Sequence, residues 1–262
     1  MAKFCSLFSG SSGNCTYIGT PDGGILIDVG VSAARTTKAL AEHDIDPDTI
    51  KAIFVTHAHT DHISGIKVFA AKNNIPVYLT AGTLDGIKNA NAFSENVQYN
   101  LLDEGDVLLD FAKVSHFNTS HDCEGSCGYV IELADRKLAV CTDLGYVSDE
   151  VHTAISGCDM VMLESNHDLK LLQNNSYYPY PLKRRIMSDV GHLSNNACAE
   201  EAVKLLKSGT TRFMLAHLSR ENNMPTLARE TTKERLELSG ANDEVDYRLA
   251  VAAPFGNRMI VL

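Results

Sequence analysis

The amino-acid sequence predicts an α/β fold in which two β-sheets pack face to face and helices cover the outer faces. Two observations support this prediction: apolar runs of strand length occur in both halves of the chain, and helical patterns lie between them. At 262 residues the chain is long enough to bury a large core. Because other arrangements of strands and helices have the same overall pattern, the sequence motifs must decide between them.

The N-terminal part of the chain is predicted to begin with short strands. The loop 9–14, whose glycines and small polar residues suit a tight turn, separates the first two strands. Ser32 is a candidate N-cap, and Pro47 bounds the helix that follows it. The predicted elements are strands at 4–8, 15–19, 25–29 and 51–56 and a helix from 32 to about 43.

In the middle of the chain, helical and strand patterns first alternate and then give way to a run of strands. Helices are predicted at 65–72 and 83–90, where the spacing of apolar residues is helical. Strands are predicted at 77–79, 97–101, 107–111, 113–118, 128–133, 137–141 and 160–164. The segment 174–181 is rich in Asn, Tyr and Pro and is predicted to be a loop.

The C-terminal part contains the strongest helical pattern. A helix is predicted from 194 to 206, with Gly209 as its stop signal, and the last helix should begin near Pro225. A shorter helix is expected at 182–187, and strands are expected at 212–216, 245–252 and 258–262. Since the sequence shows no repeat, low-complexity tract or linker, we predict one domain, residues 1–262.

Composition and cysteine usage indicate a cytoplasmic protein. Hydrophobic residues make up 44% and charged residues 21%, as in ordinary globular chains. The first residues lack an export signal, and no apolar run has membrane-spanning length, so no membrane partner is expected. The seven cysteines should be reduced, and Cys123 with Cys127 has no second pair to complete a four-cysteine zinc site. With a net charge of −10, binding a nucleic acid would require a local basic patch.

The segment His57-Ala58-His59-Thr60-Asp61-His62 is the clearest chemical feature of the chain. Four residues with metal-ligating side chains occur within six positions, directly after a predicted buried strand. Imidazole nitrogens and a carboxylate suit Zn²⁺, Mn²⁺ or Fe²⁺, and the ligand types do not choose between these metals. The sequence therefore predicts a metal site here.

This segment resembles the His-x-His-x-Asp-His signature of the metallo-β-lactamase superfamily, whose fold is a four-layer αββα sandwich. Asp28, His121, Asp143 and His217 resemble the other motif residues of that family, in the same order, and the likeness extends from Phe4 to about Asn223. His116 competes with His121, but the following Gly128-Tyr129 favours His121.

The resemblance implies a site for two divalent metal ions, zinc or manganese, with iron as a further option. One metal would be held by His57, His59 and His121, and the other by Asp61, His62 and His217. Asp143 would bridge the two metals, and Asp28 would support the ligands from behind. Such a pair can hold a hydroxide at neutral pH, so the implied reaction is hydrolysis, with Asp61 and Asp143 among the catalytic residues.

His192 lies in Gly191-His192-Leu193-Ser194-Asn195, which resembles a motif of the nuclease side of the superfamily, notably ribonuclease Z. In those enzymes the histidine is near the scissile phosphate and can protonate the leaving oxygen. The resemblance thus implies that His192 is a catalytic acid. The alternative is that His192 only packs or caps at the start of the following helix.

Four separate segments resemble the YycJ/VicX (WalJ) branch of the superfamily. They are 9–14, 178–185, 191–195 and 218–223. Members are regarded as 5′-to-3′ DNA exonucleases or related phosphodiesterases linked to mismatch repair, so the resemblance implies a DNA substrate. The candidate substrate-binding residues are Lys183, Arg184, Arg185 and Tyr180, as a local basic patch with an aromatic ring, together with Ser12, Asn14 and Arg220.

Other functions stay open at this stage. Only 48 residues separate Asp143 from His192, too few for the inserted domain of β-CASP nucleases, and no long arm like that of ribonuclease Z is present. Both absences argue against long structured RNA substrates. The alternatives are a hydrolase of small esters, thioesters or lactams and a regulatory binding protein with a vestigial site. The sequence does not choose between DNA and RNA, between exonuclease and endonuclease, or between oligomeric states.

Overall fold

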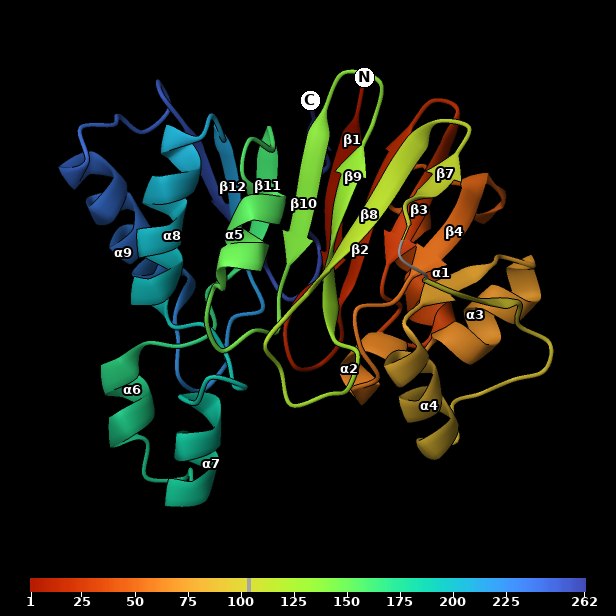
Figure 1. Cartoon of the computed structure of the whole chain (residues 1–262), viewed down its shortest axis with the longest axis horizontal. Coiled ribbons are helices and arrows are strands. Elements are labelled where there is room, and N and C mark those ends of the chain that lie inside the picture. The colour runs from red at the N-terminus through yellow and green to blue at the C-terminus, as the bar shows by residue number, and fades with distance from the viewer. Residues whose placement is uncertain (103–104) are drawn as a thin grey trace.

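The structure, a computed structural model, describes residues 1–102 and 105–262. Within these residues, fourteen strands form two seven-stranded sheets (Figure 1). The first sheet has the order β14 (Ile260–Val261), β1 (Lys3–Phe8), β2 (Cys15–Thr20), β3 (Gly23–Ile27), β4 (Ile50–Phe54), β5 (Val77–Leu79) and β6 (Tyr99–Leu101). The second has the order β13 (Arg248–Val251), β12 (Arg212–Ala216), β11 (Met160–Glu164), β10 (Lys137–Cys141), β9 (Cys127–Glu132), β8 (Ala112–Asn118) and β7 (Val107–Leu109).

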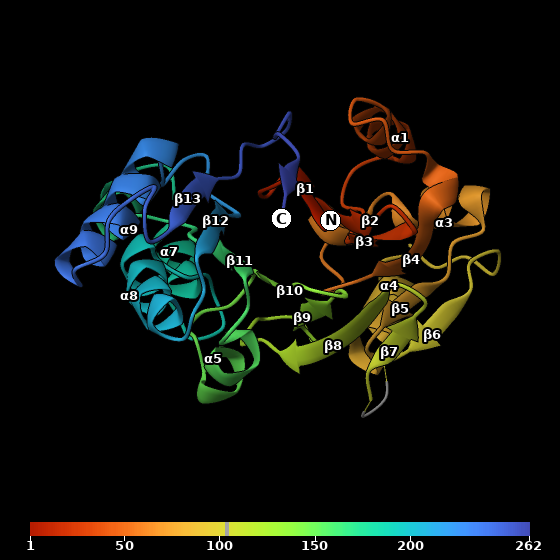
Figure 2. The same ribbon diagram turned by 90° about the horizontal axis from the view of Figure 1, so that it is seen from above.

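Helices cover the outer face of each sheet (Figure 2). The first sheet packs against α1 (Ala33–Ala41), α3 (Ile66–Asn73) and α4 (Ala81–Asn89). The second packs against α5 (Asp149–Ile155), α8 (Asn195–Lys207) and α9 (Pro225–Leu238). The short helices α2 (Thr60–Ile63), α6 (Leu169–Asn174) and α7 (Tyr180–Ile186) lie at the lower end of the molecule in Figure 1. A 3-10 turn, Pro47–Thr49, precedes β4.

The space between the two sheets is filled by a separate apolar core. Phe54 of β4 stacks on Tyr78 of β5 at 5.1 Å between ring centroids, and it meets the edge of Tyr129 of β9 at 5.4 Å. Apolar side chains from both sheets complete this cluster. The layers are therefore helix, sheet, sheet and helix, and the predicted αββα sandwich is confirmed.

Most of the predicted elements are confirmed, with small shifts at their ends. Ser32 caps α1 as expected, since its side chain accepts a hydrogen bond from the first-turn amide of Arg35. Ser194, predicted to be the first residue of its helix, is instead the N-cap of α8 and accepts from the amide of Ala197. The closing strands are shorter than predicted, and α7 begins at Tyr180, inside the segment predicted to be a loop. Helices α2, α5 and α6 were not predicted. Each has fewer than about two turns, and so short a helix shows little periodicity in the spacing of its apolar residues. None of the helices in the described ranges has the length and apolar character of a bilayer-crossing segment.

Three strands end in the same unusual backbone conformation. Asp28 follows β3, Asp143 lies two residues after β10, and His217 follows β12, and their φ angles are +62°, +60° and +55°. Few non-glycine residues adopt this left-handed region, which costs free energy and turns the chain sharply. All three are residues that the sequence motifs single out, and all three turns lie where the sheets end beside α2.

Tyr129 connects the two sheets behind that end. Its hydroxyl donates a hydrogen bond of 2.6 Å to the carbonyl oxygen of Val55, and both groups are buried. We expect Tyr129→Phe to lower the free energy of unfolding by about 1–3 kcal/mol, because the buried carbonyl would keep only the weak contact from the Cys127 thiol at 3.8 Å. Urea-induced unfolding measures this change. Tyr177→Phe, at a side chain that is 90% exposed, is the control, and equal stability of the two variants would contradict the expectation.

Candidate metal centre

The histidine-rich segment lies where β4 leaves the first sheet, and α2 forms part of it (Figure 1). Residues from the second sheet meet it there, because β10, β11 and β12 run parallel and end at the same edge. Four overlapping groups of possible metal ligands result, and within each group the ligand atoms lie within 4.8 Å of one another. Three of the four groups combine residues from both halves of the fold, and the fourth, Asp143, Glu164, His192 and His217, comes from the second sheet and the loops that follow its strands.

The first set consists of His57, His59 and His121. Nε2 of His57 is 3.0 Å from Nδ1 of His59, and Nε2 of His121 is 3.3 Å from the same atom. On its other side, Nδ1 of His121 lies 3.1 Å from the carbonyl oxygen of Gly191, which assigns the proton to Nδ1. The lone pair of Nε2 is therefore directed toward the other two imidazoles.

The second set consists of Asp61, His62 and His217. Oδ2 of Asp61 is 3.7 Å from Nε2 of His62 and 3.7 Å from Nε2 of His217. Asp143 lies between the two sets: its carboxylate oxygens are 3.4 Å from Nε2 of His62 and 3.9 Å from Nε2 of His121. Its side chain is only 2% exposed, and within the described residues it approaches nitrogens of both sets.

Asp28 and Thr56 orient the imidazoles from behind. Asp28 accepts hydrogen bonds from the amide and the hydroxyl of Thr56, both at 2.8 Å, and from Nδ1 of His62 at 2.7 Å. Since the Thr56 hydroxyl donates to Asp28, it accepts from Nδ1 of His57, 3.0 Å away. Both histidines thus carry their protons on Nδ1, which makes Nε2 the candidate ligand atom of each.

Glu164 has a corresponding role in the second sheet, and the sequence reasoning missed it. It is the last residue of β11 and is fully buried. Its Oε1 atom lies 2.8 Å from Nδ1 of His217 and 2.9 Å from Nδ1 of His192. Its Oε2 atom accepts from the backbone amides of Leu144 and Leu193. The Glu164 carboxylate therefore orients both His217, a candidate metal ligand, and His192, the candidate acid.

The donor atoms suit divalent cations. Oδ2 of Asp143 and Nε2 of His217 are buried without a hydrogen-bond partner in the described residues, although such atoms normally have one. Burial alone would lower the pKa values of His62 and His217, but the surrounding carboxylates outweigh it and raise both. The buried carboxylates thus favour positive charge at this place, and divalent metal ions would supply it.

His192 lies beside both ligand sets. Its ring centroid is 5.2 Å from that of His121 and 5.3 Å from that of His217, and its side chain is 20% exposed. Burial would lower its pKa, but Glu164 and then Asp143 raise it above the ordinary value. Because Nδ1 donates to Glu164, Nε2 is the atom available to a substrate. The arrangement therefore favours the protonated imidazole, with Nε2–H directed to a substrate.

The predicted substrate-binding residues have different surroundings. Arg185 forms an ion pair with Asp122, and Nζ of Lys183 donates to the carbonyl oxygen of Gln173 at 2.7 Å. Arg184 is placed over the ring of Tyr180, 6.0 Å from its centroid. Of the three cations, Arg184 has no ion pair or hydrogen bond with the described residues, so it is the best placed to meet an added phosphate.

The other three candidates, Ser12, Asn14 and Arg220, differ in their exposure. Nη2 of Arg220 donates to the hydroxyl of Ser12 at 2.7 Å, and both side chains are at the surface. Asn14 is instead buried, and its side-chain amide nitrogen lies 3.0 Å from Nε2 of His62. His116 lies on β8 and belongs to none of the ligand groups found in residues 1–102 and 105–262.

Two of the segments that resemble the YycJ/VicX branch meet in a buried network of side-chain amides. Asn223 and Asn195 exchange hydrogen bonds of 2.9 Å, and Ser165 donates to Asn195 at 2.7 Å. Asn223 also donates to the carbonyl oxygens of Ser165 and Asn166. The end of β11, the start of α8 and the loop after His217 are thereby fastened together behind the metal centre.

Comparisons with known proteins agree with this geometry. Residues 24–218 match the family described as beta-lactamase superfamily domain. Exodeoxyribonuclease YycJ of Bacillus anthracis is 37% identical over 238 residues, which cover 90% of each chain. Exodeoxyribonuclease WalJ of Streptococcus pneumoniae serotype 2 is 34% identical over 255 residues, which cover 96% of this chain and 94% of that protein. The crystal structure of the metallo-beta-lactamase fold protein YhfI from Bacillus subtilis has a TM-score of 0.74 at 14% identity and covers 98% of this chain and 99% of that one, a likeness of fold.

Proposed function

The chain belongs to the beta-lactamase superfamily, in its YycJ/WalJ branch, and from this premise we propose that it is a metal-dependent nuclease that degrades DNA from the 5′ end. One observation carries the proposal beyond the names of its relatives. His192, fixed by Glu164, lies directly beside two sets of metal-ligand atoms. A phosphodiester hydrolase needs an acid for its leaving oxygen at this place.

The proposed site holds two divalent cations, zinc or manganese. His57, His59 and His121 would hold one, Asp61, His62 and His217 the other, and Asp143 would contact both. When bound, such a pair supplies an activated water and stabilises negative charge on the phosphate. The ligands come from both sheets, and β14 near the C-terminus pairs with β1, so we propose that residues 1–262 act as one domain.

The protein's own residues would perform the remaining steps. His192 donates the proton from Nε2 to the leaving oxygen, and the Glu164 carboxylate stabilises the charged imidazole until the transfer. Asp28 and Thr56 keep the ligand nitrogens aimed at the cations, so no reorganisation is needed during the reaction. We also propose a cytoplasmic location, which agrees with seven free cysteines.

Arg184 is proposed to contact a backbone phosphate of the substrate. Arg184→Ala should weaken DNA binding and reduce the slope of log Kd against log salt by about 0.7–0.9, the value for one phosphate contact. Fluorescence anisotropy at several salt concentrations measures the slope, and metal content should not change. Lys207→Ala on α8 is the control. Loss of metal from the Arg184 variant would instead show that the residue is structural.

The proposed activity is tested with purified protein loaded with Mn²⁺ or Zn²⁺. The substrates are 5′-phosphorylated double-stranded DNA, single-stranded DNA, RNA, a thioester and a lactam. We expect mononucleotide products from DNA and none after His59→Ala, which removes a ligand of the first set. Turnover of the thioester or lactam without cleavage of any nucleic acid would refute the proposal. Metal binding without any turnover would favour the regulatory alternative.

A further inference from the structure

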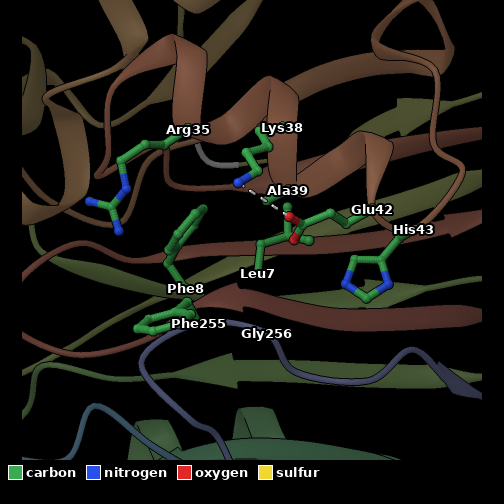
Figure 3. Close-up of a pocket in the computed structure, with 9 residues that line it drawn as sticks. All are labelled: Leu7, Phe8, Arg35, Lys38, Ala39, Glu42, His43, Phe255 and Gly256. Carbon is green, nitrogen blue, oxygen red and sulfur yellow. Dashed lines mark ion pairs between the residues drawn. The ribbon is translucent and has the colours of Figure 1, made fainter.

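A groove outside the metal centre lies between α1 and the end of β1 (Figure 3). Its volume is about 240 Å³. The lining residues are Leu7 and Phe8 of β1, Arg35, Lys38 and Ala39 of α1, Glu42 and His43 just beyond it, and Phe255 and Gly256. The groove thus combines an aromatic wall with basic side chains, and none of its residues belongs to the metal-ligand groups.

The aromatic wall is held rigidly although it faces solvent. The Phe255 side chain is 67% exposed, but its backbone forms a β-bridge with Phe8. Asn257 closes the turn around it: its side chain donates to the carbonyl oxygens of Ser6 and Ala253, both at 2.8 Å, and accepts from the amide of Ala253 at 2.7 Å. An exposed aromatic ring on a fixed turn can bind a flat partner with little loss of entropy.

The groove is also basic, in a chain whose net charge is −10. The guanidinium carbon of Arg35 lies 4.8 Å from the centroid of the Phe8 ring, and no acidic side chain of residues 1–102 and 105–262 forms an ion pair with it. Lys38 is 3.8 Å from Glu42, but both side chains are exposed, and such pairs are weak in water. Both cations are therefore available to an anion beside the aromatic wall.

This groove is close to the metal centre. Ser9 follows Phe8 directly, and its hydroxyl accepts a hydrogen bond of 2.9 Å from the backbone amide of His217. Covalent geometry then places the Cα atoms of Phe8 and His217 within about 11 Å of each other. A polymer whose scissile bond lies at the metal centre can reach the groove after a few of its units.

We propose that this groove binds a single-stranded segment of the nucleic acid, with one base stacked on Phe255 and its phosphates beside Arg35 and Lys38. Stacking on an aromatic ring together with contacts from cations is the usual means of binding a single strand without reading its sequence. The inference rests on the proposed nuclease function, since that function supplies the polymer. It adds a second contact that would retain a long strand between successive cleavages.

The test compares Phe255→Ala and Arg35→Ala with Leu108→Ala, an apolar side chain of β7 that is 75% exposed, and with Lys207→Ala. Binding is measured by anisotropy with a labelled 12-nucleotide single strand whose linkages are phosphorothioates and resist cleavage. We expect Phe255→Ala to weaken binding by about 5- to 100-fold. Arg35→Ala should reduce the salt slope by about 0.7, and the controls should match the wild type.

Cleavage provides a second measurement. The groove variants should raise KM for a 12-nucleotide strand but leave cleavage of a dinucleotide unchanged, because a dinucleotide is too short to reach the groove. If the wild type cleaves DNA and the groove variants bind and cleave like the controls, the groove inference is wrong and the nuclease proposal stands. If the wild type cleaves no nucleic acid but its binding depends on Phe255 and Arg35, the nuclease proposal fails and the groove is supported. Conversion of a dimer to a monomer by Phe255→Ala, with unchanged binding of the strand, would make the groove an interface between copies and overturn the inference.

Discussion

Asp143→Ala is expected to reduce hydrolysis at least a thousandfold. Its carboxylate lies 3.4 Å from Nε2 of His62 and 3.9 Å from Nε2 of His121, so it approaches both ligand sets from a position that is almost completely buried. Without Asp143, the two ligand sets would no longer share a carboxylate ligand. A thousandfold loss corresponds to about 4 kcal/mol of transition-state stabilisation, a reasonable amount for a group that positions both cations.

The measurement pairs steady-state rates with metal content determined by atomic absorption. We expect Asp143→Ala to retain the fold, judged by circular dichroism, and to bind less than its full complement of metal. Asp106→Ala is the control, because Asp106 has the same side chain but lies at the surface beside Lys113. A variant that lacks Asp143 and still hydrolyses DNA at the wild-type rate would exclude the bridging role.

Glu164→Gln should lower kcat by about 10²- to 10⁴-fold, the range for loss of an oriented general acid. Oε1 accepts from both His217 and His192, and Oε2 accepts from two backbone amides. Glutamine has only one acceptor atom in place of two, so its NH₂ group must face N–H donors whichever way the amide is turned. Either the two histidines or the two backbone amides would then face the NH₂ group. The histidines would lose their fixed orientation directly, or through displacement of the Gln side chain from the two amides, although the shape of the side chain hardly changes.

The pH profile separates this role from a purely structural one. Glu164 raises the pKa of His192, so in Glu164→Gln that pKa should fall. As His192 donates a proton, activity is lost when pH rises through its pKa, and the alkaline limb of the profile should therefore move to lower pH. Glu200→Gln, at a surface position paired with Arg235, should change neither kcat nor the profile. An unshifted alkaline limb in the slower Glu164 variant would mean that His192 is not the acid.

The sequence predicted those parts of the fold whose signals are local. The strands at 77–79, 137–141, 160–164 and 212–216 were predicted to the residue, because each is an apolar run closed by polar residues. Ser32 was identified as a cap for the same reason. Ser148 and Asp168, the caps of α5 and α6, are also residue types typical of helix caps. The helices that follow them are too short to show a helical spacing of apolar residues.

Relations between distant residues were much harder to predict. Glu164 ends an apolar strand, much as Asp28 directly follows one. Nothing near Glu164 in the sequence shows that it contacts His192 and His217, 28 and 53 residues later. Similarly, the basic run at 183–185 looks uniform, but Arg185 is occupied by Asp122, 63 residues earlier in the chain. Phe8 and Phe255 lie at opposite ends of the chain, so only the fold reveals the groove that they share.

The left-handed turns at Asp28, Asp143 and His217 restrict what mutation can do at these positions. Apart from glycine, the residues that adopt such a backbone most readily are Asn, Asp and His, while β-branched side chains are strongly disfavoured there. These tolerated types are nearly the same as those that can bind or orient a metal ion. The backbone conformation and the chemistry of metal binding thus favour the same few residue types at these positions. If these three positions were randomised in a search for new activities, few of the variants that still fold would have non-polar side chains at all three.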